Sequence, residues 1–124
     1  IRNIEEPNAE TRIRNVIRDL MEQCWRLDKL GLDHGELSRA PKHIIISPQD
    51  KACIIDFETA SINRKVSNVT SICQYLFIRS RVADIMKEKI GEIRKEELIK
   101  ALKIYKNNLS RENFEKILRI CRLN

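Results

Sequence analysis

Three side chains in the first half of the sequence are of types that could carry out chemistry, and they fall in two short segments. His34 and Glu36 lie together in Leu32–Leu37, and Asp56 follows a short apolar run 20 residues after Glu36. A carboxylate at the end of a strand is a hard oxygen ligand for a divalent cation that bridges phosphates. Asp56 fits that role, although a strand-terminal aspartate can also cap the turn that follows it. Phosphoryl transfer is one reaction that such carboxylates could serve, because positioning and charge neutralisation dominate it.

A long helix is predicted before the segment with His34 and Glu36. Between Asn8 and Leu30 the apolar residues recur at steps of three and four, which forms a single stripe on an α-helix. Gly31 is well placed to end this helix, because glycine readily adopts the left-handed conformation found there. The helix would therefore deliver the chain directly into the segment that carries the two side chains.

Two short apolar runs, Ile44–Ile46 and Ala52–Ile55, flank a stretch with turn composition and predict a β-hairpin that ends at Asp56. The rest of the chain has helical periodicity. We expect further helices that run from Ser67 or Asn68 through Phe77, over 82–90 with an end at Gly91, over 95–107, and from a Ser110 cap through Cys121. The predicted fold class is mainly α with a small β-hairpin.

This order of elements and motifs resembles the C-terminal lobe of the protein-kinase-like superfamily. There, a long helix leads to a catalytic loop of the form His-x-Asp-Leu, and a hairpin then delivers the aspartate of an Asp-Phe-Gly motif. Here His34-Gly35-Glu36-Leu37-Ser38 and Asp56-Phe57-Glu58 stand in those places. The first motif is similar to the His-Gly-Asp-Leu-Ser form of RIO kinases. It is closer still to archaeal predicted serine/threonine protein kinases, which carry a glutamate or similar residue in the loop and Asp-Phe-Glu at the metal site.

The resemblance, which covers about residues 10–80, implies a role for each matching residue. Glu36 would orient the acceptor hydroxyl and take its proton, Asp56 would hold the metal, and His34 would bond the backbone near Asp56 as a scaffold. Ser38, His43 and Asp56 would contribute to binding ATP together with Mg²⁺ or Mn²⁺. Glu36 could alternatively be an ordinary glutamate of a surface loop.

His43 departs from the family pattern. It stands where the family has a second metal ligand, an asparagine, just before the first hairpin strand. An imidazole is a poorer ligand for Mg²⁺ than an amide oxygen is, but it suits Mn²⁺ better. His43 would therefore be a metal ligand alongside Asp56, or it would only hydrogen-bond Asp56 or the loop.

Several parts of a complete kinase are not found in the sequence. It contains no Gly-rich phosphate loop, no lysine of the Val-Ala-Ile-Lys type, and no Ala-Pro-Glu motif after Asp56. The chain also begins with Ile1. We therefore expect one domain, 1–124, that is the C-terminal lobe of a longer kinase, with the catalytic loop and metal motif in 1–80, a basic helical portion in 81–124, and the N-terminal lobe absent from this chain.

The net charge of +6 comes entirely from the last part of the sequence. Residues 79–124 contain 13 Lys and Arg against 7 Asp and Glu, whereas residues 1–78 contain 11 of each. Such a segment is compatible with an anionic partner such as RNA or a ribonucleoprotein, or it is only a solvated, Lys-rich surface. One helix in this segment is predicted to bury an apolar stripe formed by Leu98, Leu102 and Tyr105. Its opposite, solvent-facing side would carry Lys100, Lys103 and Lys106.

The four cysteines and the hydropathy pattern indicate the compartment. No two cysteines have the spacing of a metal or redox pair, so two or more of them are expected to be core thiols in a reducing environment. The sequence has no apolar run long enough to span a bilayer and no signal peptide. A cytoplasmic protein is therefore predicted.

Three hypotheses for function follow. The first is an ATP- and metal-dependent serine/threonine phosphotransferase that acts on a protein acceptor or an RNA-associated partner. The second is a pseudokinase, in which Glu36 and His43 mark the loss of activity. The third is a helical nucleic-acid-binding module that uses residues 79–124. Metal-dependent nucleotide binding distinguishes the first hypothesis from the third, and turnover distinguishes the first from the second.

Overall fold

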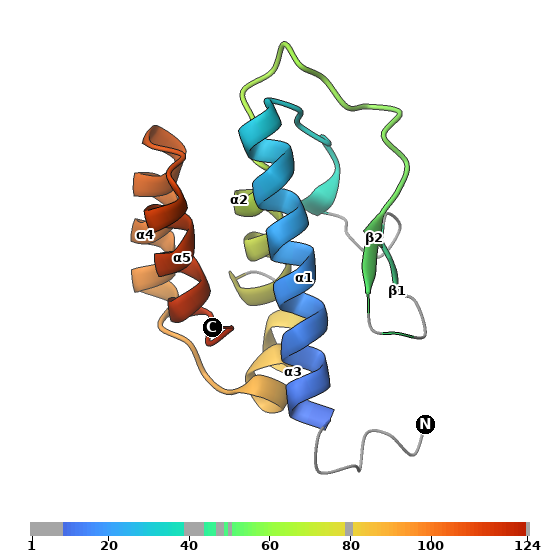
Figure 1. Cartoon of the computed structure of the whole chain (residues 1–124). Helices are drawn as coiled ribbons and strands as arrows, with labels where there is room; N and C mark the ends of the chain where they lie inside the picture. The colour runs from blue at the N-terminus through green and yellow to red at the C-terminus, as the bar shows by residue number, and fades with distance from the viewer. Residues whose placement is uncertain (1–8, 39–43, 47–48, 50, 79–80, 124) are drawn as a thin grey trace.

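The computed structural model describes residues 9–38, 44–46, 49, 51–78 and 81–123, and these residues are mainly α-helical, as predicted. Helix α1 (Ala9–Leu30) runs through the middle of the molecule, with a two-stranded ribbon on one side and the pair α4–α5 on the other (Figure 1). No helix within these ranges is both long enough and apolar enough to cross a membrane.

Helix α1 occupies the range that the apolar stripe predicts, and Asn8 lies outside the described residues. Its buried side chains are Ile17, Leu20, Met21, Cys24 and Asp28. Gly31 ends the helix with a φ of +81°, which confirms the predicted left-handed residue. The chain then turns into the segment that carries His34 and Glu36.

Strands β1 (Ile44–Ile46) and β2 (Ala52–Ile54) pair antiparallel, with Ile44 opposite Ile54. Ala52 and Ile54 are buried, whereas Cys53 between them is exposed, so β2 turns one face toward the body of the protein. Asp19 of α1 fixes the start of β2, because its carboxylate accepts a hydrogen bond from the Ala52 N–H at 2.9 Å. This hydrogen bond fixes the position of β2, the strand that leads to Asp56.

Three helical elements follow the loop after β2. Helix α2 (Asn68–Cys73) continues into a wider π-helical turn, η3 (Gln74–Ile78), where the sequence pattern predicts an uninterrupted α-helix. Helix α3 (Arg81–Ile90) ends at Gly91, whose φ of +104° matches the predicted stop. The predicted α-helix through Phe77 is therefore wrong in its last turn.

The last two helices are α4 (Lys95–Asn107), with the bounds that the sequence predicts, and α5 (Arg111–Ile120), which ends one residue before the predicted end at Cys121. Ser110 caps α5 as expected, because its hydroxyl accepts a hydrogen bond from the Asn113 N–H at 3.1 Å. The stripe predicted to be buried on α4 is buried, since Leu98, Leu102 and Tyr105 are at most 4% exposed.

The helices and β2 share one hydrophobic core. The residues buried in it come from α1, β2, α2, η3, α3, α4 and α5, and include Met21, Ile72, Leu98 and Phe114. Cys24, Cys73 and Cys121 are free thiols within this core, as predicted, while Cys53 is a free thiol at the surface. Burial raises the pKa of the Cys24 thiol, so that it stays protonated and behaves as a small apolar group.

Candidate functional site

His34 joins the two segments that carry the predicted chemistry. Its side chain is fully buried, and its Nε2 lies 2.9 Å from the carbonyl oxygen of Ile55, the residue before Asp56. Its Nδ1 accepts a hydrogen bond from the Glu36 N–H at 3.2 Å. Because a backbone N–H can only donate and a carbonyl can only accept, the imidazole is the tautomer with its proton on Nε2. The predicted bond from His34 to the backbone beside Asp56 is therefore present.

Glu36 lies two residues further along, half-buried, with its carboxylate held by Thr59. The Thr59 hydroxyl lies 2.9 Å from Glu36 Oε2 and 3.1 Å from the carbonyl oxygen of His34. A hydroxyl has a single proton, so these two acceptors share one donor. This contact brings the loop after Asp56 against the loop that carries Glu36.

Gly35 makes this close approach possible. Its φ is +97°, and a Cβ at this position would lie 2.6 Å from Nη2 of Arg64 and 3.0 Å from Oγ1 of Thr59. Only glycine fits both the left-handed backbone and the narrow space. The Arg64 guanidinium occupies that space and donates to the carbonyl oxygen of Thr59 at 2.7 Å.

Asp56 follows β2 with an exposed side chain and a φ of +62°. Left-handed backbone at a residue with a Cβ is uncommon and carries strain, and such residues concentrate at functional sites. The next residue, Phe57, packs edge-on against the His34 ring, with the ring centroids 4.8 Å apart. The buried His34 thus contacts both neighbours of Asp56, while the Asp56 side chain itself is exposed to solvent.

The other two predicted nucleotide or metal contacts are less well defined. Ser38 is half-buried and directly follows Leu37, which is only 1% exposed and anchors the loop in the core. His43 lies outside the described residues. In the part of the chain that the structure describes, no three His, Cys, Asp or Glu side chains gather to form a metal cage. Mg²⁺ that arrives with phosphate does not require such a cage, because it is typically bound by one or two carboxylates plus substrate oxygens.

A buried polar network behind this site includes residues that the sequence analysis did not identify as functional. Asp28, at the end of α1, is 2% exposed and accepts four hydrogen bonds. They come from the Asn68 N–H at 3.0 Å, the Asn68 side chain at 2.8 Å, the Val69 N–H at 3.4 Å and the Tyr105 hydroxyl at 2.6 Å. Asn68 in turn accepts a hydrogen bond from the His34 N–H at 2.8 Å.

Burial raises the pKa of Asp28, while hydrogen bonds from Tyr105 and Asn68 oppose that shift. Burial, together with the adjacent Asp28, raises the pKa of Tyr105, so the phenol remains a donor. One signal could have revealed Asp28 in advance. It lies four residues after Cys24, on the apolar stripe of the helix, where a charged residue must have buried partners.

Asp33 fastens the same loop to the start of α2. Its carboxylate bonds the Arg64 guanidinium at 2.7 Å and accepts from the Ser67 N–H at 2.9 Å, and the side chain is 5% exposed. Its backbone also pairs with that of Ser61, because the N–H of each residue donates to the carbonyl oxygen of the other at 3.0 Å. The first amides of α2 are therefore capped from α1 and the loop, while Ser67 at the N-cap makes no side-chain cap bond.

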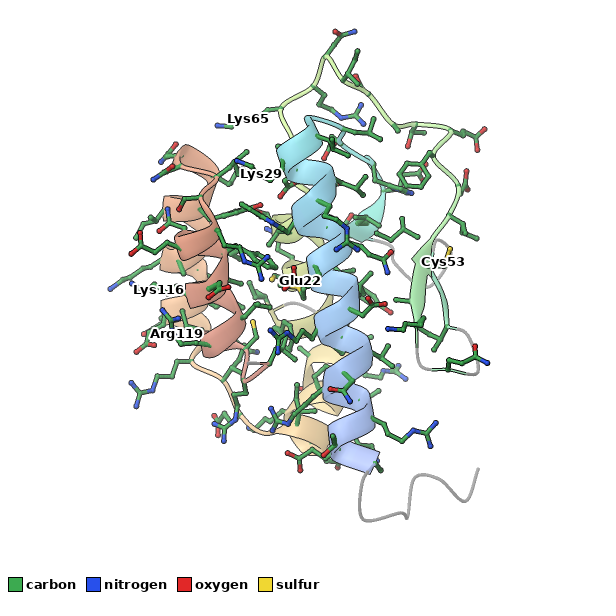
Figure 2. All side chains as sticks on the ribbon, in the orientation of Figure 1. Glu22, Lys29, Cys53, Lys65, Lys116 and Arg119 are labelled. Atoms are coloured by element: carbon green, nitrogen blue, oxygen red, sulfur yellow. The ribbon has the colours of Figure 1, made fainter. Side chains whose placement is uncertain are left out.

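The basic surface of 81–124 is spread over two helices. Lys100, Lys103 and Lys106 are exposed on α4, as predicted. On α5, Lys116 and Arg119 point away from α1 (Figure 2), but they alternate with Glu112 and Glu115. The α5 side is thus mixed in charge, and α4 carries exposed Glu96 and Glu97 in its first turn before the three lysines.

Comparison with known proteins links the chain to one archaeal relative. No protein-family model matches it. Over 80 residues it is 30% identical to the uncharacterized protein MJ1211 of Methanocaldococcus jannaschii, and the matched segment covers 64% of this chain and 67% of the relative. The chain therefore belongs to the same family as this archaeal protein.

Proposed function

We propose that this chain is the catalytic lobe of an ATP- and divalent-metal-dependent phosphotransferase of the atypical serine/threonine protein kinase type. The observation that carries the proposal is the contact of His34 Nε2 with the carbonyl oxygen of Ile55 at 2.9 Å. It links the loop with Glu36 to the end of the strand that delivers Asp56, two segments that phosphoryl transfer requires side by side. The structure is mainly α-helical, and the more specific assignment to a kinase-like C-terminal lobe is part of the same proposal.

Each residue would have a separate task. Asp56 would hold the divalent cation, which when bound neutralises charge on the transferred phosphoryl group. Glu36 would accept a hydrogen bond from the acceptor hydroxyl and orient its oxygen toward the γ-phosphorus of ATP. It would receive the hydroxyl proton as the new O–P bond forms and the bond from the γ-phosphorus to ADP, the leaving group, breaks. His34 would touch neither reactant, because both its ring nitrogens are occupied by backbone groups. Ser38 and His43 would complete the nucleotide side.

The test is phosphate transfer by the protein in which this chain is joined to an N-terminal lobe. We expect transfer of the γ-phosphate of ATP to the protein itself or to a basic protein acceptor, dependent on Mg²⁺ or Mn²⁺. Asp56→Asn should abolish this transfer while the circular dichroism and melting curve stay unchanged. Asp84→Asn, an exposed aspartate on α3, is the matched control. Equal rates in Asp56→Asn and the control would disprove the assignment of Asp56.

The 124-residue chain alone should bind ATP weakly, because under this proposal it would supply the metal ligand without a Gly-rich loop to hold the phosphates. Calorimetry with ATP and Mn²⁺ tests this. A dissociation constant below about 1 μM, or about −8 kcal/mol of binding free energy, would contradict the missing-lobe interpretation.

A second candidate function, binding of RNA or a ribonucleoprotein, is favoured by the exposed lysines of α4, Lys100, Lys103 and Lys106. Phosphate contacts release counterions, so affinity for tRNA should fall steeply between low and moderate salt. Replacing the three lysines with Gln should weaken that binding, whereas replacing Lys87 and Lys89 of α3 is the control. No binding by the wild-type chain at low salt would exclude this function.

A further inference from the structure

A buried chain of hydrogen bonds connects α4 to the segment with His34 and Glu36. The Tyr105 hydroxyl donates to Asp28 Oδ2 at 2.6 Å. The other oxygen of Asp28 accepts from the side chain of Asn68 at 2.8 Å, and Asn68 Oδ1 accepts from the His34 N–H at 2.8 Å. Tyr105, Asp28, Asn68 and His34 are all at most 2% exposed. Water therefore cannot replace a missing partner without rearrangement.

Asn68 has a partner at every polar atom of its side chain. Its amide nitrogen donates to Asp28 Oδ1 at 2.8 Å and to the carbonyl oxygen of Leu32 at 2.7 Å, while its oxygen accepts from His34. Only one amide orientation satisfies these three contacts, because the nitrogen must face Asp28 and Leu32. The amide is thus locked, and its oxygen is fixed at the point that the His34 N–H must reach.

We propose that Asp28, Asn68 and Tyr105 are positioning residues that set the backbone of the loop at His34, and through it the place of Glu36. The catalytic consequence rests on the proposed phosphotransferase function, whereas the structural consequence does not. Tyr105 belongs to the basic portion, 81–124, so that portion contributes to the geometry of the site and is more than a surface for a partner.

The order of the contacts explains why the effect reaches Glu36. Asp28 orients Asn68, Asn68 fixes the His34 N–H, and the His34 ring accepts from the Glu36 N–H at 3.2 Å. The same ring reaches Ile55 beside Asp56. Without the Tyr105 hydroxyl, Asp28 Oδ2 keeps the longer contact from the Val69 N–H at 3.4 Å, and Asp28 Oδ1 keeps its bonds from Asn68. Asp28 then holds the Asn68 amide less firmly.

The experiment measures amide hydrogen exchange of His34 in the 124-residue chain by NMR. Tyr105→Phe removes one oxygen and keeps the ring that packs against Trp25 and Phe114. We expect exchange at His34 to rise about tenfold or more, while the amide of Ile117 in α5 keeps its protection. Asn68→Ala should raise it further. Tyr75→Phe, the loss of another tyrosine hydroxyl outside the network, is the control.

Unchanged exchange at His34 in both Tyr105→Phe and Asn68→Ala, with Ile117 still protected, would overturn the proposal. In the protein with its N-terminal lobe, Tyr105→Phe should lower kcat several-fold and leave KM for ATP unchanged, because the hydroxyl touches no reactant. A wild-type protein without transferase activity would disprove the proposed function, yet the exchange measurement would still decide whether the network positions the loop.

Discussion

At the scale of single residues, the candidate site depends on how a few polar atoms are shared. His34 uses both ring nitrogens on backbone groups, so it fixes the geometry of the site and presents neither nitrogen to a reactant. Glu36 keeps its carboxylate at the surface side of the same loop, held at one oxygen by Thr59. The proposed base is therefore separate from the residue that positions it.

Glu36→Gln should lower kcat of the phosphotransferase about a hundredfold or more, because the amide keeps the shape of the side chain but cannot take a proton. ATP affinity should change little, since Glu36 faces the acceptor in the proposed mechanism. Steady-state kinetics with varied ATP separates the two effects. Full activity in Glu36→Gln would assign the base to another residue or remove the need for one.

Thr59→Val should lower kcat about tenfold while preserving the fold, because valine has the same shape and lacks the hydroxyl that holds Glu36. Thr59→Ser keeps the hydroxyl and should restore most of the rate. Parallel kcat and melting measurements on both variants test this. If valine and serine variants reacted equally fast, Thr59 would have no part in orienting Glu36.

At the scale of elements, α1 is attached to its neighbours by both apolar and polar contacts. Apolar side chains pack it into the shared core, and a bidentate ion pair also joins it to α5. In that pair the Arg111 guanidinium donates to both oxygens of Glu22 at 2.7 Å each. Arg111 also lies over the rings of Trp25 and Phe114, so the charge sits at the edge of an aromatic cluster (Figure 2 labels Glu22).

The pair should make stability depend on pH in the acid range. The hydrogen bond from Arg111 lowers the pKa of Glu22 in the folded protein. A lowered pKa means that its stabilisation is fully present above the unfolded pKa, about 4.3, and is lost as pH falls through the folded pKa. Arg111 is 43% exposed on its side chain, so solvent limits the contribution to about 1 kcal/mol or less.

Glu22→Gln should therefore cost up to about 1 kcal/mol at pH 7 and almost nothing at about pH 3, as measured by urea unfolding at the two values. Glu112→Gln on α5 is the control, because Glu112 has no ion pair with another residue in the described ranges. A cost that stays the same at both pH values would show that the Glu22 pair contributes no pH-dependent stability.

At the scale of the whole molecule, one core connects the loop that carries the site to the basic C-terminal helices. Phe114 is fully buried and stacks on Trp25 at 5.2 Å, and Tyr105 completes the cluster. The same tyrosine reaches Asp28, so the packing of α4 and α5 on α1 is linked to the start of α2. Residues 81–124 and the earlier segment should therefore unfold together.

Phe114→Ala should destabilise the whole chain by about 3–5 kcal/mol, because it opens a cavity in that shared core. Far-ultraviolet circular dichroism and the near-ultraviolet signal from Trp25 should give the same lowered unfolding midpoint. Amide exchange at His34 should report the same loss of unfolding free energy. Ile104→Ala, at a side chain 51% exposed on α4, should cost about 0.5 kcal/mol or less. Separate transitions for α4–α5 and for the loop would contradict a single cooperative unit.

The sequence alone determined the elements whose signals are local. The apolar stripe of α1, the left-handed glycines Gly31 and Gly91, and the Ser110 cap each depend on residues a few positions apart, so they could be predicted with their bounds. The bond of His34 to the backbone near Asp56 followed from the family resemblance. The roles of Glu36, Ser38, His43 and Asp56 in phosphate transfer stay predictions.

The tertiary structure decided what depends on partners far apart in the chain. Asp28 meets Asn68 and Tyr105 across 40 and 77 positions, and Asp33 meets Arg64 across 31. No periodicity within one element encodes such pairs, because each side chain is chosen by what packs opposite it after the helices dock. The same holds for the cap of α2. The sequence predicts only that this helix starts at Ser67 or Asn68, whereas in the structure Asp28 and Asp33 supply the cap, because a buried carboxylate needs those amides as donors.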